Sequence, residues 1–331
     1  MSFSGFDLVS VGRASMDLYS QDIGAPFEEI TGFDTMVGGS PANIAIGVSR
    51  LGMSAVLLTA VGDDAVGDFV IRYLRDEGVE TEFVPRKAGK LTSLALIGVQ
   101  PPSTFPLSYY REDPADIYLD ETDVGRAPIP SARALQISGN ALSRGPRAQA
   151  TRTALRIGRD ANVERFLDLD LRPTEWDDPR AFGTAIREVL PDFDVAIGTE
   201  EEFAAALLPN HTPNGTLPVT LRTDLDDVIR GLGAAAARVT VVKRGERGAT
   251  VFDGQDRLDV PGFTVEVVNT VGAGDSFAAG LIRSRLLGWD WWEAARFANA
   301  CGAIVVTRHS CSAAFPSEEE TLAFASEAGG L

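Results

Sequence analysis

Short apolar runs bounded by glycine recur along the chain, and stretches with helical periodicity separate them. Each run has about the length of a strand that is buried on both faces, which is typical of a parallel sheet. The pattern predicts strands at 7–12, 55–62, 134–139, 195–199 and 239–245, and helices at 66–77, 147–160, 180–190 and 225–237. Because strand and helix alternate, we expect an α/β fold with a doubly wound, mostly parallel sheet flanked by helices.

Two stretches interrupt this rhythm, at about residues 15–37 and 88–120. The second contains a run of polar and aromatic residues at 108–118. We expect the two stretches to form a small β lid that is inserted in one α/β core domain spanning 1–331. Residues 317–331 are expected to form a closing helix.

The composition narrows the functional classes. The 331 residues are 44% hydrophobic and 23% charged, and no apolar run reaches the roughly 18 residues of a membrane span. The amino terminus has no basic stretch followed by an apolar run, so we expect a cytoplasmic protein without a membrane partner. The formal net charge of -17 argues against a nucleic-acid partner, because such binding relies on many Lys and Arg contacts with phosphate.

Cysteine and histidine are too scarce for several kinds of site. Only Cys301 and Cys311 are present, which is too few for a disulfide framework or a four-thiolate zinc site, and we expect both to be reduced. His211 and His309 cannot form a histidine-rich metal cluster. The chain also lacks an obvious Gly-x-Ser-x-Gly elbow, so hydrolase and zinc chemistry are disfavoured.

A glycine-rich segment at 269–280 opens an apolar helix that we expect to end near Gly288. A helix that begins in glycine presents unpaired N–H groups and the positive end of its dipole, and it lets a phosphate approach the backbone. Asp275 lies in the first turn, where it would repel phosphate unless it accepts a proton from an attacking hydroxyl. The segment therefore predicts phosphoryl transfer. The alternative is that Asp275 only caps the helix.

A second segment, residues 37–45, carries the signals of a helix start, with Ser40 as the expected N-cap. Gly38 and Gly39 permit close approach of a ligand to the backbone, and Asn43 offers both a donor and an acceptor. These properties suit a polyhydroxylated substrate. The alternative is a well-capped helix after a turn.

The two segments resemble the signature motifs of the PfkB, or ribokinase-like, carbohydrate kinases. Residues 38–43 match the first signature and residues 272–275 match the second. The resemblance covers nearly the whole chain, and further matches in the family's order lie at 11–17, 168–176, 199–202 and 241–248. It implies a ribokinase-like fold and an enzyme that transfers phosphate from ATP to an alcohol group of a carbohydrate.

The resemblance also implies roles at the reacting centre. Asp275 would be the catalytic base, and the amides of Gly272, Ala273 and Gly274 would form an anion hole for the charge on the transferred phosphoryl group. For Asp17, a turn residue at a strand end is the alternative. The residues implied to contact substrate hydroxyls are Asp17, Gly38, Gly39 and Asn43.

On the nucleotide side the resemblance implies ATP and Mg²⁺. Glu202 matches the family's Asn-x-x-Glu motif and would hold Mg²⁺ through water, although Thr199 stands where the family has asparagine. The alternatives are a solvated helix start for 200–202 and a solvated surface cation for Lys243. The residues implied to line the ATP site are Thr199, Lys243, Gly245, Gly248 and Asn299.

Two further properties of the family are left open. Asn269 stands where many relatives place an aspartate that helps bind a monovalent cation, so a cation requirement is not settled. Relatives often dimerise through the lid, which leaves a homodimer of this chain open as well.

Within the family, the stretches 110–116, 168–176 and 307–316, together with 12–18, resemble kinases that act on keto-deoxy sugar acids. Arginine can bind a carboxylate bidentately, and Arg111 and Arg172 are the candidates for this role. Asp170 replaces the family's usual asparagine, which would shift the substrate preference. The alternative for Arg172 is a structural ion pair with Asp168 or Asp170.

Other functions stay open at this point. Two isomeric keto-deoxy acids fit the same residues, and a neutral sugar such as fructose or ribose ranks below them because it gives Arg111 no role. A non-catalytic, sugar-binding regulator is the alternative of a different class, and Asp275 with its intact glycines argues against it.

Overall fold

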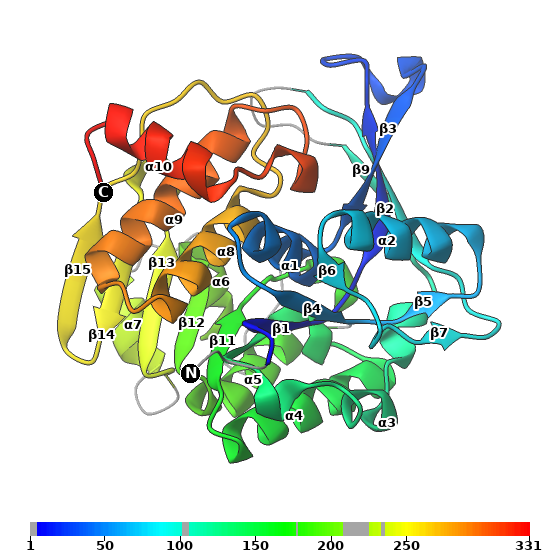
Figure 1. The fold of residues 1–331 in the computed structure, drawn as a ribbon, viewed down its shortest axis with the longest axis horizontal. Helices are drawn as coiled ribbons and strands as arrows, with labels where there is room; N and C mark the ends of the chain where they lie inside the picture. The colour runs from blue at the N-terminus through cyan, green and yellow to red at the C-terminus, as the bar shows by residue number, and fades with distance from the viewer. Residues whose placement is uncertain (1–4, 101–105, 177, 208–224, 233–235) are drawn as a thin grey trace.

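A nine-stranded sheet runs through the middle of the molecule in the computed structural model, which describes residues 5–100, 106–176, 178–207, 225–232 and 236–331 (Figure 1). The strand order is β15-β14-β13-β12-β11-β10-β1-β4-β6. Neighbouring strands are parallel from β13 to β6, whereas β14 and β15 are added antiparallel. The bounds are β1 (Leu8–Val11), β4 (Ala55–Leu58), β6 (Val79–Glu80), β10 (Ala134–Ser138), β11 (Glu164–Asp168), β12 (Val195–Thr199), β13 (Val239–Lys243), β14 (Ala249–Asp253) and β15 (Asp256–Val260).

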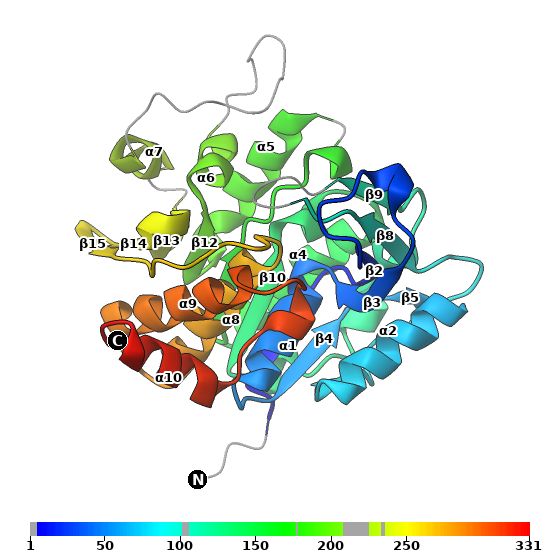
Figure 2. The same ribbon diagram turned by 90° about the horizontal axis from the view of Figure 1, so that it is seen from above.

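Helices cover both faces of this sheet, as the edge-on view in Figure 2 shows. One face carries α1 (Ser40–Arg50), α2 (Ala65–Asp76), α8 (Ala273–Leu286) and α9 (Trp291–Val306), with α10 (Glu318–Glu327) against α9. The other carries α3 (Glu121–Val124), α4 (Gly145–Asp160), α5 (Pro179–Val189), α6 (Glu200–Ala206) and α7 (Leu225–Leu232). Successive strand residues such as Phe166 and Leu167 enter opposite cores because side chains alternate across a strand. The predicted doubly wound α/β fold is confirmed.

A second, four-stranded sheet stands beside the main one, with the order β3-β2-β8-β9. Its strands are β2 (Ser15–Ser20), β3 (Phe33–Gly38), β8 (Ser93–Ile97) and β9 (Leu107–Tyr110), and the pair β5 (Val61–Gly62) and β7 (Arg86–Lys87) lies apart. These four strands come from the two stretches that interrupt the core pattern, at 15–37 and 88–120. We call them the lid sheet, and the closing motion that this name implies stays a proposal.

Some element bounds differ from the prediction. The run 55–62 is divided between β4 and β5, which belong to different sheets. The hairpin of β14 and β15 was not predicted as strands, because polar residues such as Asp253, Asp256 and Arg257 hide the apolar pattern at this sheet edge. The helix expected at 225–237 ends at Leu232 in the described residues; 233–235 lie outside them, and 236–237 are not helical.

Short 3-10 helices join the elements. They are η1 (Phe27–Glu29), η2 (Ala115–Tyr118), η3 (Ile129–Ser131), η4 (Gly139–Leu142), η5 (Pro173–Glu175), η6 (Leu190–Asp192), η8 (Gly245–Arg247) and η9 (Ser312–Ala314). Among the residues that the structure describes, no helix has both the length and the apolar character needed to cross a membrane.

Parallel pairing brings the carboxyl ends of β1, β10, β11, β12 and β13 to one edge of the main sheet. The start of α1 and the start of α8 belong to helices that pack against each other. In open α/β sheets, ligands bind outside the carboxyl ends of the strands, so this edge is where the candidate residues are expected to meet.

Candidate active site

Helix α8 begins at a glycine whose backbone only glycine adopts readily. Gly272 is the N-cap with φ of 86°, and no side chain caps the helix. A Cβ atom at this position would collide with the Sγ atom of Cys311. The first N–H groups of a helix have no intrahelical acceptor, which is the arrangement that binds anions. Of these groups, Ala273 N makes a long hydrogen bond of 3.4 Å to the Thr270 carbonyl oxygen. Because Asp275 does not cap α8, the simple capping alternative is wrong.

Asp275 is held by an amide from the other motif. Asn43 donates from Nδ2 to Asp275 Oδ2 at 2.7 Å. Burial raises the pKa of Asp275, the negative charge of Asp170 adds to this, and the hydrogen bond from Asn43 opposes it. A carboxylate with a raised pKa is a better proton acceptor than an exposed one. The structure thus brings the two signature motifs together, although 232 residues separate them.

A buried ion pair lies beneath the start of α8. Lys243 Nζ is 3.1 Å from Asp168 Oδ1, and the two side chains are 14% and 2% exposed. A Cβ atom on Gly274 would lie only 3.2 Å from Lys243 Nζ, so the ammonium group sits close to the anion-binding amides. Lys243 is therefore not a solvated surface cation. Burial raises the pKa of Asp168 to about 7 even though Lys243 lowers it, and the carboxylates of Glu202 and Asp275 contribute to the rise.

The substrate-side residues gather around the carboxyl end of β1. Asp17 on β2 is buried and accepts a hydrogen bond from Ser15 Oγ at 2.7 Å. A side chain at position 38 would collide with the Asp17 carboxylate, which is why Gly38 is required there. Asn43 has both Nδ2 hydrogens placed, toward Asp275 and toward Cys311 Sγ at 3.3 Å, while its Oδ1 atom is buried and unpartnered. That oxygen is an acceptor ready for a substrate hydroxyl.

Asp170 follows β11 in a left-handed conformation, with φ of 38°, which is uncommon for a residue other than glycine. It accepts from Ser138 Oγ at 2.6 Å and pairs with Arg172 Nε at 2.9 Å. Burial opposes its ionisation, but Arg172 and Arg13 hold the pKa of Asp170 below its usual value. Arg172 therefore does form the ion pair with Asp170, and its side chain is still 45% exposed.

Glu202 joins two strand ends. It forms a capping box with Thr199, whose backbone N–H donates to Glu202 Oε2 at 2.8 Å, and Leu171 N donates to Oε1 at 3.0 Å. Among the described residues no group of three or more acidic, Cys or His side chains could enclose a metal ion. Mg²⁺ keeps several waters and usually binds through one or two carboxylates plus substrate phosphates, so Glu202 near the buried Asp168 fits a water-linked Mg²⁺.

The other residues predicted to bind ATP lie near β13, β14 and β15, at one end of the main sheet. Gly245 and Gly248 shape the turn from β13 to β14, with φ of 58° and 85°. Asn299 on α9 donates from Nδ2 to the carbonyl oxygens of Val260 and Pro261, at 3.3 and 3.1 Å. This amide therefore ties α9 to β15, and only its oxygen is left for a ligand.

Asn269 stands at the position where many relatives have an aspartate that helps bind a monovalent cation. Its Nδ2 donates to the His309 carbonyl oxygen at 2.7 Å, and its Oδ1 accepts from Val271 N at 2.9 Å. Both polar atoms of the Asn269 side chain are thus engaged within the protein.

Arg111 lies in a buried cluster rather than in an open site. We call Arg13, Arg111, Arg147, Asp116 and Glu175 the arginine cluster. Arg111 donates to both oxygens of Asp116 at 2.6 and 2.8 Å, to Ser93 Oγ at 2.6 Å, and to Glu175 through Nε. Four of its five N–H groups are therefore used within the protein.

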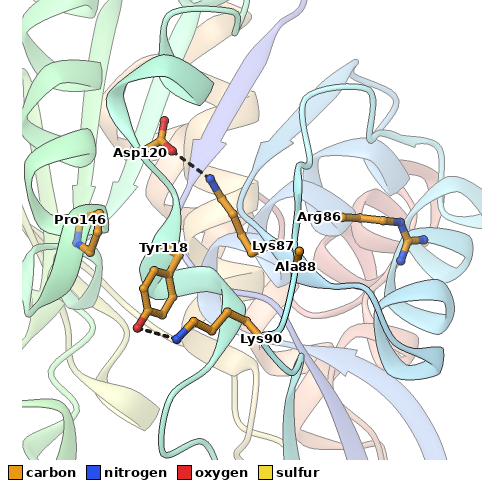
Figure 3. A pocket seen from close by; sticks show the side chains of 7 residues that line it. All are labelled: Arg86, Lys87, Ala88, Lys90, Tyr118, Asp120 and Pro146. Carbon is orange, nitrogen blue, oxygen red and sulfur yellow. Dashed lines mark hydrogen bonds and ion pairs between the residues drawn. The ribbon is translucent and has the colours of Figure 1, made fainter.

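Two hollows lie outside this edge of the sheet. One, of about 330 Å³, is lined by cationic residues, but Lys87 and Lys90 already bind Asp120 and the Tyr118 hydroxyl (Figure 3). The other, of about 910 Å³, is lined by Tyr109, Tyr110, Arg111, Arg144 and Glu175 among others, so it borders the lid sheet and the arginine cluster. Asp275 lines neither of them.

Sequence reasoning missed three residues of this site. For Asp168 the sequence offers only an alternative ion pair with Arg172, whereas its observed partner, Lys243, lies 75 residues away on another strand. For Cys311 the sequence predicts only a reduced thiol, yet its Sγ atom contacts Asn43. Arg13 lies in the stretch 12–18, to which the resemblance assigns no individual role.

Comparisons with known proteins agree with this geometry. The family model for pfkB family carbohydrate kinases matches residues 6–318. The 5-dehydro-2-deoxygluconokinase of Halalkalibacterium halodurans is 35% identical, over 95% of this chain and 93% of that protein. The stretches 110–116, 168–176 and 307–316 had pointed to the same kinases.

Solved structures show the same fold. A fructokinase from Xylella fastidiosa with bound ATP superposes with a TM-score of 0.83 at 25% identity, over 97% of this chain and 98% of that chain. A putative ribokinase II from E. coli, in complex with ATP and Mg²⁺, has a TM-score of 0.84 at 24% identity, with 97% and 99% covered. Because a family model and a full-length relative both match, this chain belongs to the pfkB family carbohydrate kinases and is a phosphotransferase with an alcohol group as acceptor.

Proposed function

We propose that the chain transfers the terminal phosphate of ATP to the terminal hydroxyl of 5-dehydro-2-deoxy-D-gluconate, giving the 6-phosphate in the breakdown of myo-inositol. The relative from Halalkalibacterium halodurans, named for this activity, supports the substrate. The observation that carries the reaction is Asp275, half-buried at the uncapped start of α8 and held by Asn43.

The proposed chemistry assigns one task to each group. Asp275 takes the proton of the attacking hydroxyl. Asn43 orients the Asp275 carboxylate through Nδ2, and the free Oδ1 atom of Asn43 accepts a hydrogen bond from the substrate. The amides at 272–274 and the ammonium group of Lys243 stabilise the negative charge on the phosphoryl group in flight. Glu202 holds Mg²⁺ through water, and the ion neutralises phosphate charge when it is bound.

An acid substrate explains why cationic side chains gather at the lid sheet of an acidic protein. The net charge is -17, yet Arg13 and Arg172 both lie near the predicted substrate residue Asp17, and Arg111 shares Glu175 with Arg13. Arginine stays charged at any working pH and matches the geometry of a carboxylate. Arg111 and Arg172 already form close ion pairs with carboxylates of the protein, whereas Arg13 does not, so a neutral sugar would leave Arg13 without a hydrogen-bonded counterpart.

The test is ATP consumption with the candidate acceptors. Wild-type protein should turn over 5-dehydro-2-deoxygluconate efficiently and ribose or fructose weakly. Asp275→Asn should lower kcat roughly 10²–10⁴-fold with little change in binding, because it removes the general base and keeps the side-chain shape.

Asp256→Asn, an exposed residue of β15, is the matched control and should keep full activity. A preference for the isomeric 2-dehydro-3-deoxygluconate, or equal rates on neutral sugars, would refute the substrate. Binding of the acid without any turnover by wild type would favour a regulator over an enzyme.

A further inference from the structure

Arg13 is a buried arginine whose guanidinium group donates no hydrogen bond to any residue that the structure describes. Its side chain is 7% exposed, and its Nε atom is buried and unpartnered. The nearest carboxylate oxygen, Glu175 Oε1, is 3.8 Å from Nη1, which is too long for a hydrogen bond. No residue in the described part of the chain accepts a hydrogen bond from this group. Leaving a buried charged donor unsatisfied is costly, so the site favours an incoming acceptor.

The backbone places Arg13 between the main sheet and the lid sheet. It follows β1 and Gly12, and a Cβ atom on Gly39 would lie 3.2 Å from its Cγ and 2.6 Å from its carbonyl oxygen. The aliphatic stem of Arg13 therefore fills space that only a glycine in the first signature motif leaves open.

The head of Arg13 faces the same surface of the lid sheet as the predicted substrate residue Asp17. Asp17 is paired with Ala95, and Ala95 with Tyr109, so these three side chains lie in one row on one face. The guanidinium carbon of Arg13 is 5.6 Å from the centre of the Tyr109 ring. Tyr109 also acts electrostatically on Arg172, so the two arginines lie near the same ring.

The arginine cluster around Arg13 contains more cationic side chains than carboxylates. In the arginine cluster, three arginines that are almost fully buried share two carboxylates, and Asp116 is taken by Arg111 and Arg147. Burial, together with the positive charges of Arg111 and Arg13, lowers the pKa of Arg147 to about 10 although Asp116 and Glu175 oppose this. An excess cation in a buried place is a preformed site for an anion.

Two other carboxylates, those of Asp17 and Asp170, attract Arg13 electrostatically but do not bind its guanidinium group directly. Asp170 is paired with Arg172, and Asp17 accepts its hydrogen bond from Ser15. Neither has an oxygen within 4.0 Å of the guanidinium nitrogens of Arg13. Arg13 therefore differs from Arg111, whose donors are turned toward the protein.

We propose that Arg13 binds the carboxylate of the acceptor sugar acid, next to Tyr109 and Arg172, and that Arg111 supports the site without touching substrate. The inference rests on the proposed function, since it names the residue that selects an acid. In such a substrate the carboxylate and the terminal hydroxyl are at opposite ends of the carbon chain. Arg13 thus contributes to binding rather than to the chemical step.

Kinetics of Arg13→Met, Arg13→Lys and Arg111→Met test this assignment. Arg13→Met should raise KM for the acid roughly 10–100-fold, as expected for lost hydrogen bonds to a charged group, with kcat and KM for ATP within about twofold. Arg13→Lys should recover part of the loss, because a point charge attracts a carboxylate without bidentate geometry. Arg111→Met should lower the melting temperature far more than it changes KM for the acid.

The exposed Arg156→Met, on α4, is the matched control and should change neither quantity. An unchanged KM for the acid in Arg13→Met would overturn the assignment. So would a large rise in KM for the acid in a stable Arg111→Met variant, since it would return the carboxylate to Arg111.

A second measurement separates this inference from the proposed function. Calorimetric binding of D-gluconate, used as a plain sugar-acid probe, does not depend on turnover. If wild type fails to phosphorylate 5-dehydro-2-deoxygluconate but Arg13→Met loses gluconate binding, only the proposed substrate is wrong. Equal binding by wild type and Arg13→Met, or no binding by either, overturns the role of Arg13.

Discussion

At the scale of single residues, the pair of Asp168 and Lys243 connects stability to pH. Burial raises the pKa of Asp168 to about 7, although Lys243 lies 3.1 Å away, and the same carboxyl titrates near 3.8 when it is solvated. A raised folded-state pKa gives stability that is complete below pH 3.8 and is lost as pH rises through 7. The ionised carboxylate forms the ion pair with Lys243, whose ammonium group lies close to the backbone of Gly274.

Replacing Asp168 by Asn should remove this pH dependence. The free energy of unfolding of Asp168→Asn, relative to wild type, should increase between pH 4 and 7 by at most about 1.4 kcal/mol per pH unit, the value for one proton, and level off above pH 8. Urea unfolding of both proteins at several pH values measures the difference. Parallel stability curves for the two proteins would show that Asp168 does not titrate in this range.

At the scale of elements, helix α8 has a glycine with positive φ at each end, and only the one at its start belongs to the proposed anion site. Gly272 and Gly288 both have positive φ, of 86° and 82°. A Cβ atom at 272 would meet Cys311 and Phe315, whereas a Cβ atom at 288 would meet nothing within 4 Å. Substitution of Gly288 therefore tests backbone strain alone, whereas substitution of Gly272 tests backbone strain together with displacement of the anion-binding amides.

The variants Gly272→Ala and Gly288→Ala use this difference. Gly288→Ala should lose about 1–2 kcal/mol of unfolding free energy, because a side chain in the left-handed region is strained. Gly272→Ala should lose more, because its Cβ also collides with Cys311 and Phe315. Only Gly272→Ala should lose activity, by roughly 10²-fold or more, since its collision moves the amides that stabilise the phosphoryl group. Thermal unfolding and kcat for both variants check this, and an active Gly272→Ala enzyme would speak against the anion hole.

The elements also show what the sequence could predict. The start of α8 was predictable because its glycines act on the backbone within a few residues. The start of α1 was predicted one residue too late: Gly39, with φ of 99°, is the N-cap, and Ser40, the expected N-cap, is the first helical residue and makes no capping hydrogen bond. Most buried strands were predictable from their apolar runs. The β14–β15 hairpin was not, because it lies at the sheet edge, where polar side chains face water and obscure the pattern. The partners of Arg111 depend on tertiary packing, which no local pattern encodes.

At the scale of the whole molecule, the arginine cluster connects the lid sheet to the core. Arg111 follows β9, Arg147 belongs to α4, Glu175 to η5, and Asp116 in η2 accepts from both arginines. Burial opposes the ionisation of Asp116, but Arg111 and Arg147 lower its pKa to about 2. A depressed pKa gives stability that is present above pH 3.8 and is lost as pH falls through 2.

Asp116→Asn should therefore destabilise the whole protein, by roughly 3–5 kcal/mol near pH 7, because it leaves two buried arginines without their shared carboxylate. The loss should persist down to about pH 4 and shrink only toward pH 2, where wild-type Asp116 takes up its proton. Urea unfolding at pH 7, 4 and 3 measures it, with Asp192→Asn, which removes a half-exposed partner of Arg159, as the matched control. If Asp116→Asn were as stable as this control, the charge pairs would not be what fixes the lid sheet to the core.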